Sequence, residues 1–166
     1  MNNTSYATVF AEFKDKITDP DLITFSKDLQ IEMLTAYMNK AIAKCKRVVK
    51  TVDLSKRDDE LLEFSVEIPD DVMDIITEWM TVFWLQPYVN NIENLRNNLS
   101  TKDFSVFSPA NLLEKIGNRY DIARKHARSL TNQYSYIIAD MKELKSWLML
   151  SMVCYPKKIF ADTLNF

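Results

Sequence analysis

The sequence contains a single glycine, Gly117, among 166 residues. Phosphate-binding loops, dinucleotide-binding turns and EF-hand loops all need glycine at fixed positions, so this chain cannot build any of them. Tight two-residue hairpin turns also favour glycine, which argues against an all-β protein. With 47% hydrophobic residues the chain can still bury one substantial core. The composition therefore predicts a helical protein with one core.

Few residues offer metal or nucleophilic chemistry. His126 is the single histidine, and Cys45 and Cys154 lie far apart without metal-type spacing. We expect both thiols to be buried or half-buried. Acids spaced four apart within Asp70–Glu78 could hold a divalent ion, but acids are also favoured where a helix begins. We expect no enzymatic activity, no metal and no cofactor, and retain a metal-dependent nuclease at 70–78 as a minor hypothesis.

Hydrophobic residues spaced three and four positions apart predict a series of helices. Thr4 or Ser5 is suited to cap the first helix, and Ser26 the second. Pro87 should end or kink the third helix. The expected helices cover approximately residues 6–17, 27–45, 69–86, 92–99 and 109–139, with a further amphipathic helix after Asp140. The predicted fold is an all-α helical bundle with one long helix in its C-terminal half and an extended C-terminal tail.

Residues 46–69 have weaker helical periodicity. Phe64, Val66 and Ile68 alternate with polar residues, which favours a strand. We expect at most a short two-stranded ribbon, with a loop or a helical extension as equal alternatives. The predicted core includes Trp79, Met80, Phe83, Ile116 and Tyr120.

The longest predicted helix carries a seam of apolar residues spaced alternately three and four apart. Its members are Leu113, Ile116, Tyr120, Ala123, Ala127, Leu130, Tyr134 and Ile137. Such a seam can form a coiled coil between copies, or pack the helix on its neighbours in one bundle. We favour packing within the chain, where the two alanines allow a neighbouring backbone to approach closely.

Charge is segregated along the sequence. Lys44–Arg57 contains six basic residues and one acid, whereas Asp58–Glu78 contains nine acids and no base. Such blocks commonly form solvated faces. The sharper hypothesis is a pair of complementary faces for head-to-tail contact between copies, which can close into a ring. Candidate ring-contact charges are Lys46, Arg47, Lys50, Asp58, Asp59 and Glu60.

A second basic group lies on the long helix. It comprises Arg119, Arg124, Lys125 and Arg128. These side chains could contact DNA phosphates without reading base sequence, or contact a neighbouring subunit. Solubilising charges with a salt bridge to Asp121 are an equal alternative. We expect no sequence-specific DNA binding, because no DNA-reading module is recognisable.

Four local motifs resemble the head-to-tail connector proteins of tailed bacteriophages, also called adaptor or neck proteins. The motifs are L-x-x-R-D-x-E-L-x-x-F from Leu54, WL-x-P from Trp84, NLRN-x-L-S-T-K-D from Asn94, and SPANLL from Ser108. The resemblance covers roughly residues 5 to 140.

The resemblance implies a small α-helical structural subunit with no enzymatic step. It implies a homo-oligomeric ring beneath the portal protein, usually with twelve copies. Such a ring extends the DNA channel, which allows non-specific contact with DNA, and offers a docking surface to the tail or the next neck protein. The expected location is the neck of the virion, after synthesis in the cytoplasm of the bacterial host.

The resemblance divides the chain into a helical connector domain, 1–140, and a C-terminal docking segment, 141–166. Candidate portal-docking residues are Leu144, Trp147, Leu148, Met152, Phe160 and Phe166. The alternative is that this helix packs back on its own bundle. The apolar stretch 147–155 is nine residues long, well short of the roughly 20 that span a bilayer, so we expect no membrane partner. Without a basic N-terminal region and apolar run, we expect no secretion signal.

A different functional class also fits the residues. The chain could be a helical protein-binding or regulatory module that acts as a monomer or dimer through the 113–137 seam. A stable dimer that portal protein does not affect would favour this alternative, whereas a higher-order ring would favour the connector.

Overall fold

The computed structural model describes residues 3–17, 25–98 and 109–154. The described part is mostly helical, as predicted, with a small antiparallel sheet. In chain order the elements are β1 (Thr4–Ser5), α1 (Tyr6–Lys16), α3 (Lys27–Cys45), β2 (Arg57–Asp58), β3 (Glu63–Phe64), α4 (Asp70–Asn98) and α5 (Pro109–Cys154).

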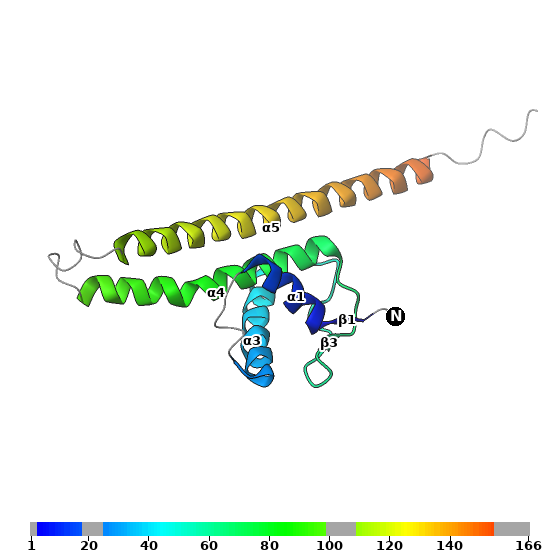
Figure 1. The fold of residues 1–166 in the computed structure, drawn as a ribbon. Helices are drawn as coiled ribbons and strands as arrows, with labels where there is room; N and C mark the ends of the chain where they lie inside the picture. The colour runs from blue at the N-terminus through cyan, green and yellow to red at the C-terminus, as the bar shows by residue number, and fades with distance from the viewer. Residues whose placement is uncertain (1–2, 18–24, 99–108, 155–166) are drawn as a thin grey trace, which may run out of the picture.

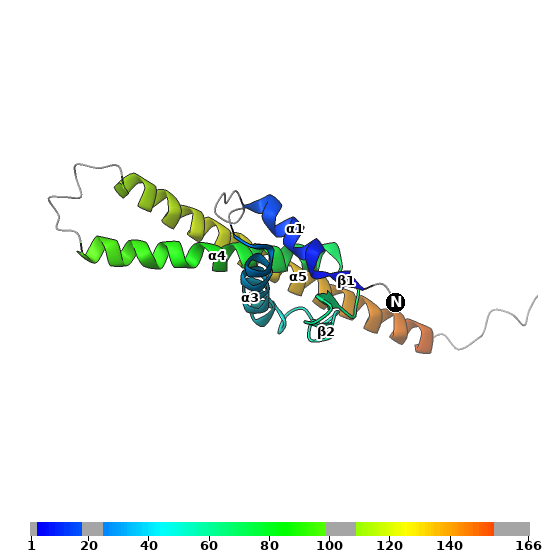
Figure 2. The same ribbon diagram turned by 60° about the horizontal axis from the view of Figure 1, so that its bottom comes forward.

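Helix α4 is the centre of the packing. It contacts α1, α3 and α5, and it runs alongside α5 for most of its length (Figures 1 and 2). Its first half buries Val72, Ile75, Ile76 and Met80 in the main core together with residues of α1 and α3. Val82 and Leu85 of α4 pack with Ala123 of α5 in a second cluster. One helix therefore carries two cores.

Short polar side chains begin the first two helices as predicted. The Ser5 Oγ accepts a hydrogen bond from the Ala7 N–H at 3.2 Å, and the Ser26 Oγ accepts one from the Leu29 N–H at 3.4 Å. Each bond satisfies a backbone donor that has no partner inside its helix.

The sheet has three strands in the order β1-β3-β2, so the predicted two-stranded limit is wrong. The third strand comes from Thr4–Ser5, which the sequence suggested as a helix cap alone. Thr4 pairs with Phe64, and the Thr4 Oγ1 accepts a hydrogen bond from the buried Ile68 N–H at 2.9 Å. Residues 4 and 68 are held together by a contact that no local pattern in the sequence reveals.

Helix α4 runs unbroken through Pro87 to Asn98, so the predicted separate helix at 92–99 is wrong. Proline removes one backbone hydrogen bond and conflicts with the carbonyl one turn earlier. Just before this position, Val82 and Leu85 are buried against α5. Packing along α5 holds the helical path past the proline.

Helix α5 also continues beyond the expected boundary at residue 140, as far as Cys154. The physical reason is local: no glycine or proline interrupts 141–154, and Met141, Glu143 and Leu144 are good helix formers. The seam packs on α4, as favoured: Ala123, Ala127 and Tyr134 are buried.

Two groups of core residues depart from prediction. Met80 is buried, but Trp79, Phe83, Ile116 and Tyr120 are half-buried. The Trp79 Nε1–H donates to the Thr131 Oγ1 at 3.1 Å, so the indole keeps a polar partner at the edge of the core. Ile137 is exposed, and Ile138 takes its predicted place against the core. The side chain of Leu113 lies outside the described ones.

The structure describes the side chain of one of the two cysteines. Cys45 is fully buried, as expected, and burial raises the pKa of its thiol to about 12. The side chain of Cys154 lies outside the described ones.

The contact between Thr4 and Ile68 gives a direct test of the N-terminal strand. Thr4→Val keeps the side-chain shape but leaves the buried Ile68 N–H without its acceptor, which should cost about 1–3 kcal/mol of unfolding free energy. Thr8→Val, at an exposed position of α1, is the matched control and should change stability little. Urea denaturation compares the two variants, and equal stabilities would contradict this role for Thr4.

Candidate functional site

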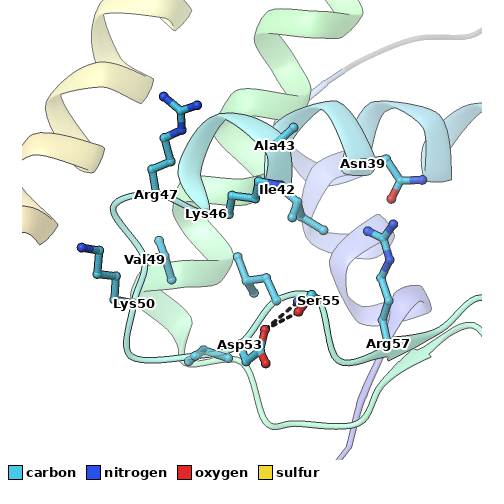
Figure 3. Close-up of a pocket in the computed structure, with 12 residues that line it drawn as sticks. Asn39, Ile42, Ala43, Lys46, Arg47, Val49, Lys50, Asp53, Ser55 and Arg57 are labelled. Atoms are coloured by element: carbon cyan, nitrogen blue, oxygen red, sulfur yellow. Dashed lines mark hydrogen bonds between the residues drawn. The ribbon is translucent and has the colours of Figure 1, made fainter.

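A basic hollow lies beneath the C-terminal end of α3 (Figure 3). Its volume is about 760 Å³. The floor is apolar and includes Ile42, Val49 and Leu54. The cations around it are Lys46, Arg47, Lys50 and Arg57. Cations are favourable at this place because the carbonyl end of a helix carries partial negative charge.

The single carboxylate that lines the hollow is held by its own turn. Asp53 accepts hydrogen bonds from the backbone N–H and the hydroxyl of Ser55, and these bonds lower the pKa of Asp53. Across the hollow, the Arg57 side chain reaches toward Asn39 (Figure 3). The Asn39 Oδ1 is buried and has no hydrogen-bond partner. Arg57 also lies beside the Asp59 carboxylate, so Lys46, Arg47 and Lys50 are the cations that leave the hollow positively charged.

The predicted acidic contacts divide between two roles. The Asp58 Oδ1 accepts hydrogen bonds from the backbone N–H groups of Glu60 and Leu61, both at 2.9 Å. Asp59 accepts a hydrogen bond from the Tyr6 hydroxyl at 2.6 Å and lies 3.6 Å from the Arg57 Nε. Both therefore shape the hairpin, while Glu60 is exposed.

A second charged group joins α1, α4 and α5. The Lys16 Nζ lies 2.9 Å from the Asp74 Oδ1 and 3.9 Å from carboxylate oxygens of Glu12 and Glu78. The His126 Nδ1 lies 3.2 Å from the Glu78 Oε1. Burial raises the pKa of Glu12, whereas the hydrogen bond from Lys16 lowers that of Asp74. Sequence analysis missed Lys16 and Glu12, whose one signal is their spacing of four.

The charged group around Lys16 bears on the minor hypothesis of a metal-dependent nuclease at residues 70–78. The Lys16 ammonium occupies the position beside Asp74 and Glu78 that a bound metal ion would need. Asp71 accepts a hydrogen bond from the Val72 N–H at the start of α4. Within the ranges that the structure covers, no group of three or more His, Cys, Asp or Glu residues is placed to hold a metal ion.

The second basic group lies on α5 as predicted, but its members have different surroundings. Arg119 is exposed and lines a hollow of about 470 Å³ together with Lys16, Asp74 and His126. Arg124 is half-buried. Lys125 and Arg128 are exposed. Among described residues these four form no ion pair, including the salt bridge suggested with Asp121.

Helix α5 carries an uncovered apolar stripe toward its C-terminal end. Ile137 is 58% exposed, Met141 49% and Leu144 58%. Figure 1 shows α5 continuing past the end of α4 that begins at Asp70. The predicted docking side chains of Trp147, Leu148 and Met152 lie outside the described ones, and Phe160 and Phe166 lie outside the described residues.

Comparison with models of known protein families, with curated proteins and with solved structures found no match to this chain. In the part of the chain that is described, no helix is both long and apolar enough to cross a membrane.

The charged group at Lys16 gives a pH-dependent prediction. Because the folded pKa of Asp74 is lowered, its stabilising effect is present above the unfolded pKa of about 4 and is lost as pH falls through the folded value. Asp74→Asn should therefore destabilise the protein at pH 7 by about 0.2–1 kcal/mol, a range suited to an exposed ion pair.

Thermal unfolding of Asp74→Asn and wild type between pH 7 and pH 2.5 measures this effect. The difference in Tm should shrink below about pH 4. Asp140→Asn, at an exposed position of α5, is the control and should show no such trend. A difference that grows as the pH falls would contradict the assigned role of Asp74.

Proposed function

We propose that this chain is the ring subunit of a bacteriophage head-to-tail connector. It binds beneath the portal, extends the DNA channel and offers an attachment surface to the tail. The observation that carries the proposal is the uncovered apolar stripe on the extension of α5. The four motifs that resemble connector proteins add support from the sequence.

The stripe supports docking because it continues a packed surface into solvent. Tyr134 is buried and Ile138 half-buried in the main core, and Met141 and Leu144 follow along the helix as exposed residues that belong to neither core cluster. Fully burying an exposed side chain of this kind is worth about 1.5–3 kcal/mol, and these side chains, which are half exposed, have about half of that left to gain. Two or three together can anchor the subunit on a protein partner, and in the proposed function that partner is the portal.

The charge layout supports assembly into a ring. The basic hollow and the charged group around Lys16 have no lining residue in common, so one copy offers two separate charged surfaces. Contacts between two different surfaces repeat from copy to copy and close when the rotation allows. Arg119, Lys125 and Arg128 are exposed and available to DNA phosphates or to the neighbouring copy.

The alternative, a binding module that dimerises through the 113–137 seam, has less support. A dimer of this kind needs the seam to be open. Ala127 is fully buried and Ala123 nearly so, because α4 packs on them. A partner could use this surface only after α4 moved away.

A charge placed in the stripe tests the docking role. Leu144→Lys should leave the melting temperature unchanged, because the side chain is exposed, and should abolish co-sedimentation with purified rings of a phage portal protein. Tyr136→Lys is the control, since Tyr136 is an exposed apolar residue on the same helix and lies outside the stripe. Co-sedimentation of Leu144→Lys at the wild-type level would contradict docking through the stripe.

A further inference from the structure

The tip of the β2–β3 hairpin presents an exposed leucine among acids. Leu61 is 69% exposed, and Glu60 beside it is also exposed. Figure 1 shows the hairpin loop projecting from the body on the side away from α5. Leu61 is therefore available for contact with a partner that offers an apolar surface.

The tip is held in one shape before any contact is made. The Asp58 carboxylate binds the N–H groups of Glu60 and Leu61, and the Tyr6 hydroxyl binds Asp59. Leu62 has a φ of 53°, a left-handed conformation that leucine rarely adopts. A strained position of this kind persists where its surroundings fix it. The tip therefore loses little conformational entropy when it is buried in a contact.

The basic hollow is complementary to the hairpin tip in polarity and in charge. Its floor is aliphatic, and Lys46, Arg47 and Lys50 around it form no ion pair with a described residue, whereas Arg57 lies beside Asp59. None of residues 58–63 lines the hollow of the same copy. An apolar tip with acidic flanks and an apolar floor with basic surroundings therefore occur on one chain, and Arg57 at the base of the hairpin is the one hairpin residue that lines the hollow.

We propose that Leu61 of one copy inserts into the basic hollow of the next copy, with Glu60 facing its cations. The contact joins two different surfaces, so it repeats head to tail and can close into a ring. The inference deepens the proposed function and rests on its ring assembly. It assigns the basic hollow and the acidic hairpin tip to one kind of subunit contact.

Paired cysteines test the contact directly. Leu61→Cys provides the tip and Ala43→Cys the hollow, because Ala43 lines the hollow and is exposed. Both are placed in a full-length Cys154→Ser chain, where the remaining Cys45 is buried. Copper phenanthroline oxidises thiol pairs that lie close together, and non-reducing electrophoresis separates the products.

The double variant should give a ladder of covalent oligomers larger than a dimer. A mixture of the two single variants should give mixed dimers and nothing larger, since each copy then carries one half of the contact. A double variant that stays monomeric, or stops at dimers, would overturn the inference. Dimers of the Leu61→Cys variant with itself, in place of mixed dimers, would also overturn it.

A charge exchange provides a second readout. Lys46→Glu should reduce the yield of mixed dimers about tenfold, which corresponds to the repulsion of one close pair of like charges. Glu60→Lys on the other copy should restore the yield. A yield unaffected by both changes would place the contact elsewhere.

The result of the cross-linking experiment can be distinguished from the result of the co-sedimentation experiment with Leu144→Lys. If the ladder forms while portal binding does not depend on Leu144, the subunit contact stands and the docking role fails. If portal binding depends on Leu144 and no ladder forms, the docking role stands and the tip-to-hollow contact is wrong.

Discussion

The packing of α4 against three other helices is the contact on which the rest of the structure depends. Ile76 and Met80 are fully buried on the side of α1 and α3, while Leu85 faces the second cluster with α5. Small side chains at 123 and 127 let the two long helices approach closely. Because α4 serves both cores, a change in its register would displace α1, α3 and α5 together.

The same packing explains what is left uncovered. Helix α5 is 46 residues long and α4 is 29, so α4 cannot cover α5 along its whole length. The apolar stripe at Met141 and Leu144 follows from this difference. The hairpin and the basic hollow likewise lie outside the α4–α5 contact, and their charges have opposite sign. We interpret these surfaces as contacts with other copies and with the portal.

Sequence patterns predicted most of the helices, because spacing of apolar residues and polar caps are local. Ser5 and Ser26 cap the helices that follow them, and the seam of α5 packs where expected as far as Tyr134. The continuation through Pro87 was not predictable from local rules, since it depends on packing against α5. The strand at Thr4 was missed for the same reason: its partners lie about sixty residues away.

The candidate surfaces were predicted less completely than the fold. The basic and acidic blocks are visible as charge runs, but the floor of the hollow is formed by side chains that look like ordinary core residues. Arg57 and Asn39, which are 18 positions apart in the sequence, line the same hollow only in the folded chain. Lys16 and Asp74 are an ion pair between residues 58 positions apart, which single-sequence spacing cannot reveal.

The most direct measurement for the ring-subunit function is the mass of the full chain by native mass spectrometry, alone and after incubation with portal rings. We expect a single higher-order assembly on the portal, with a copy number that matches the portal symmetry. A stable dimer whose mass does not change in the presence of portal would contradict the function proposed for this chain.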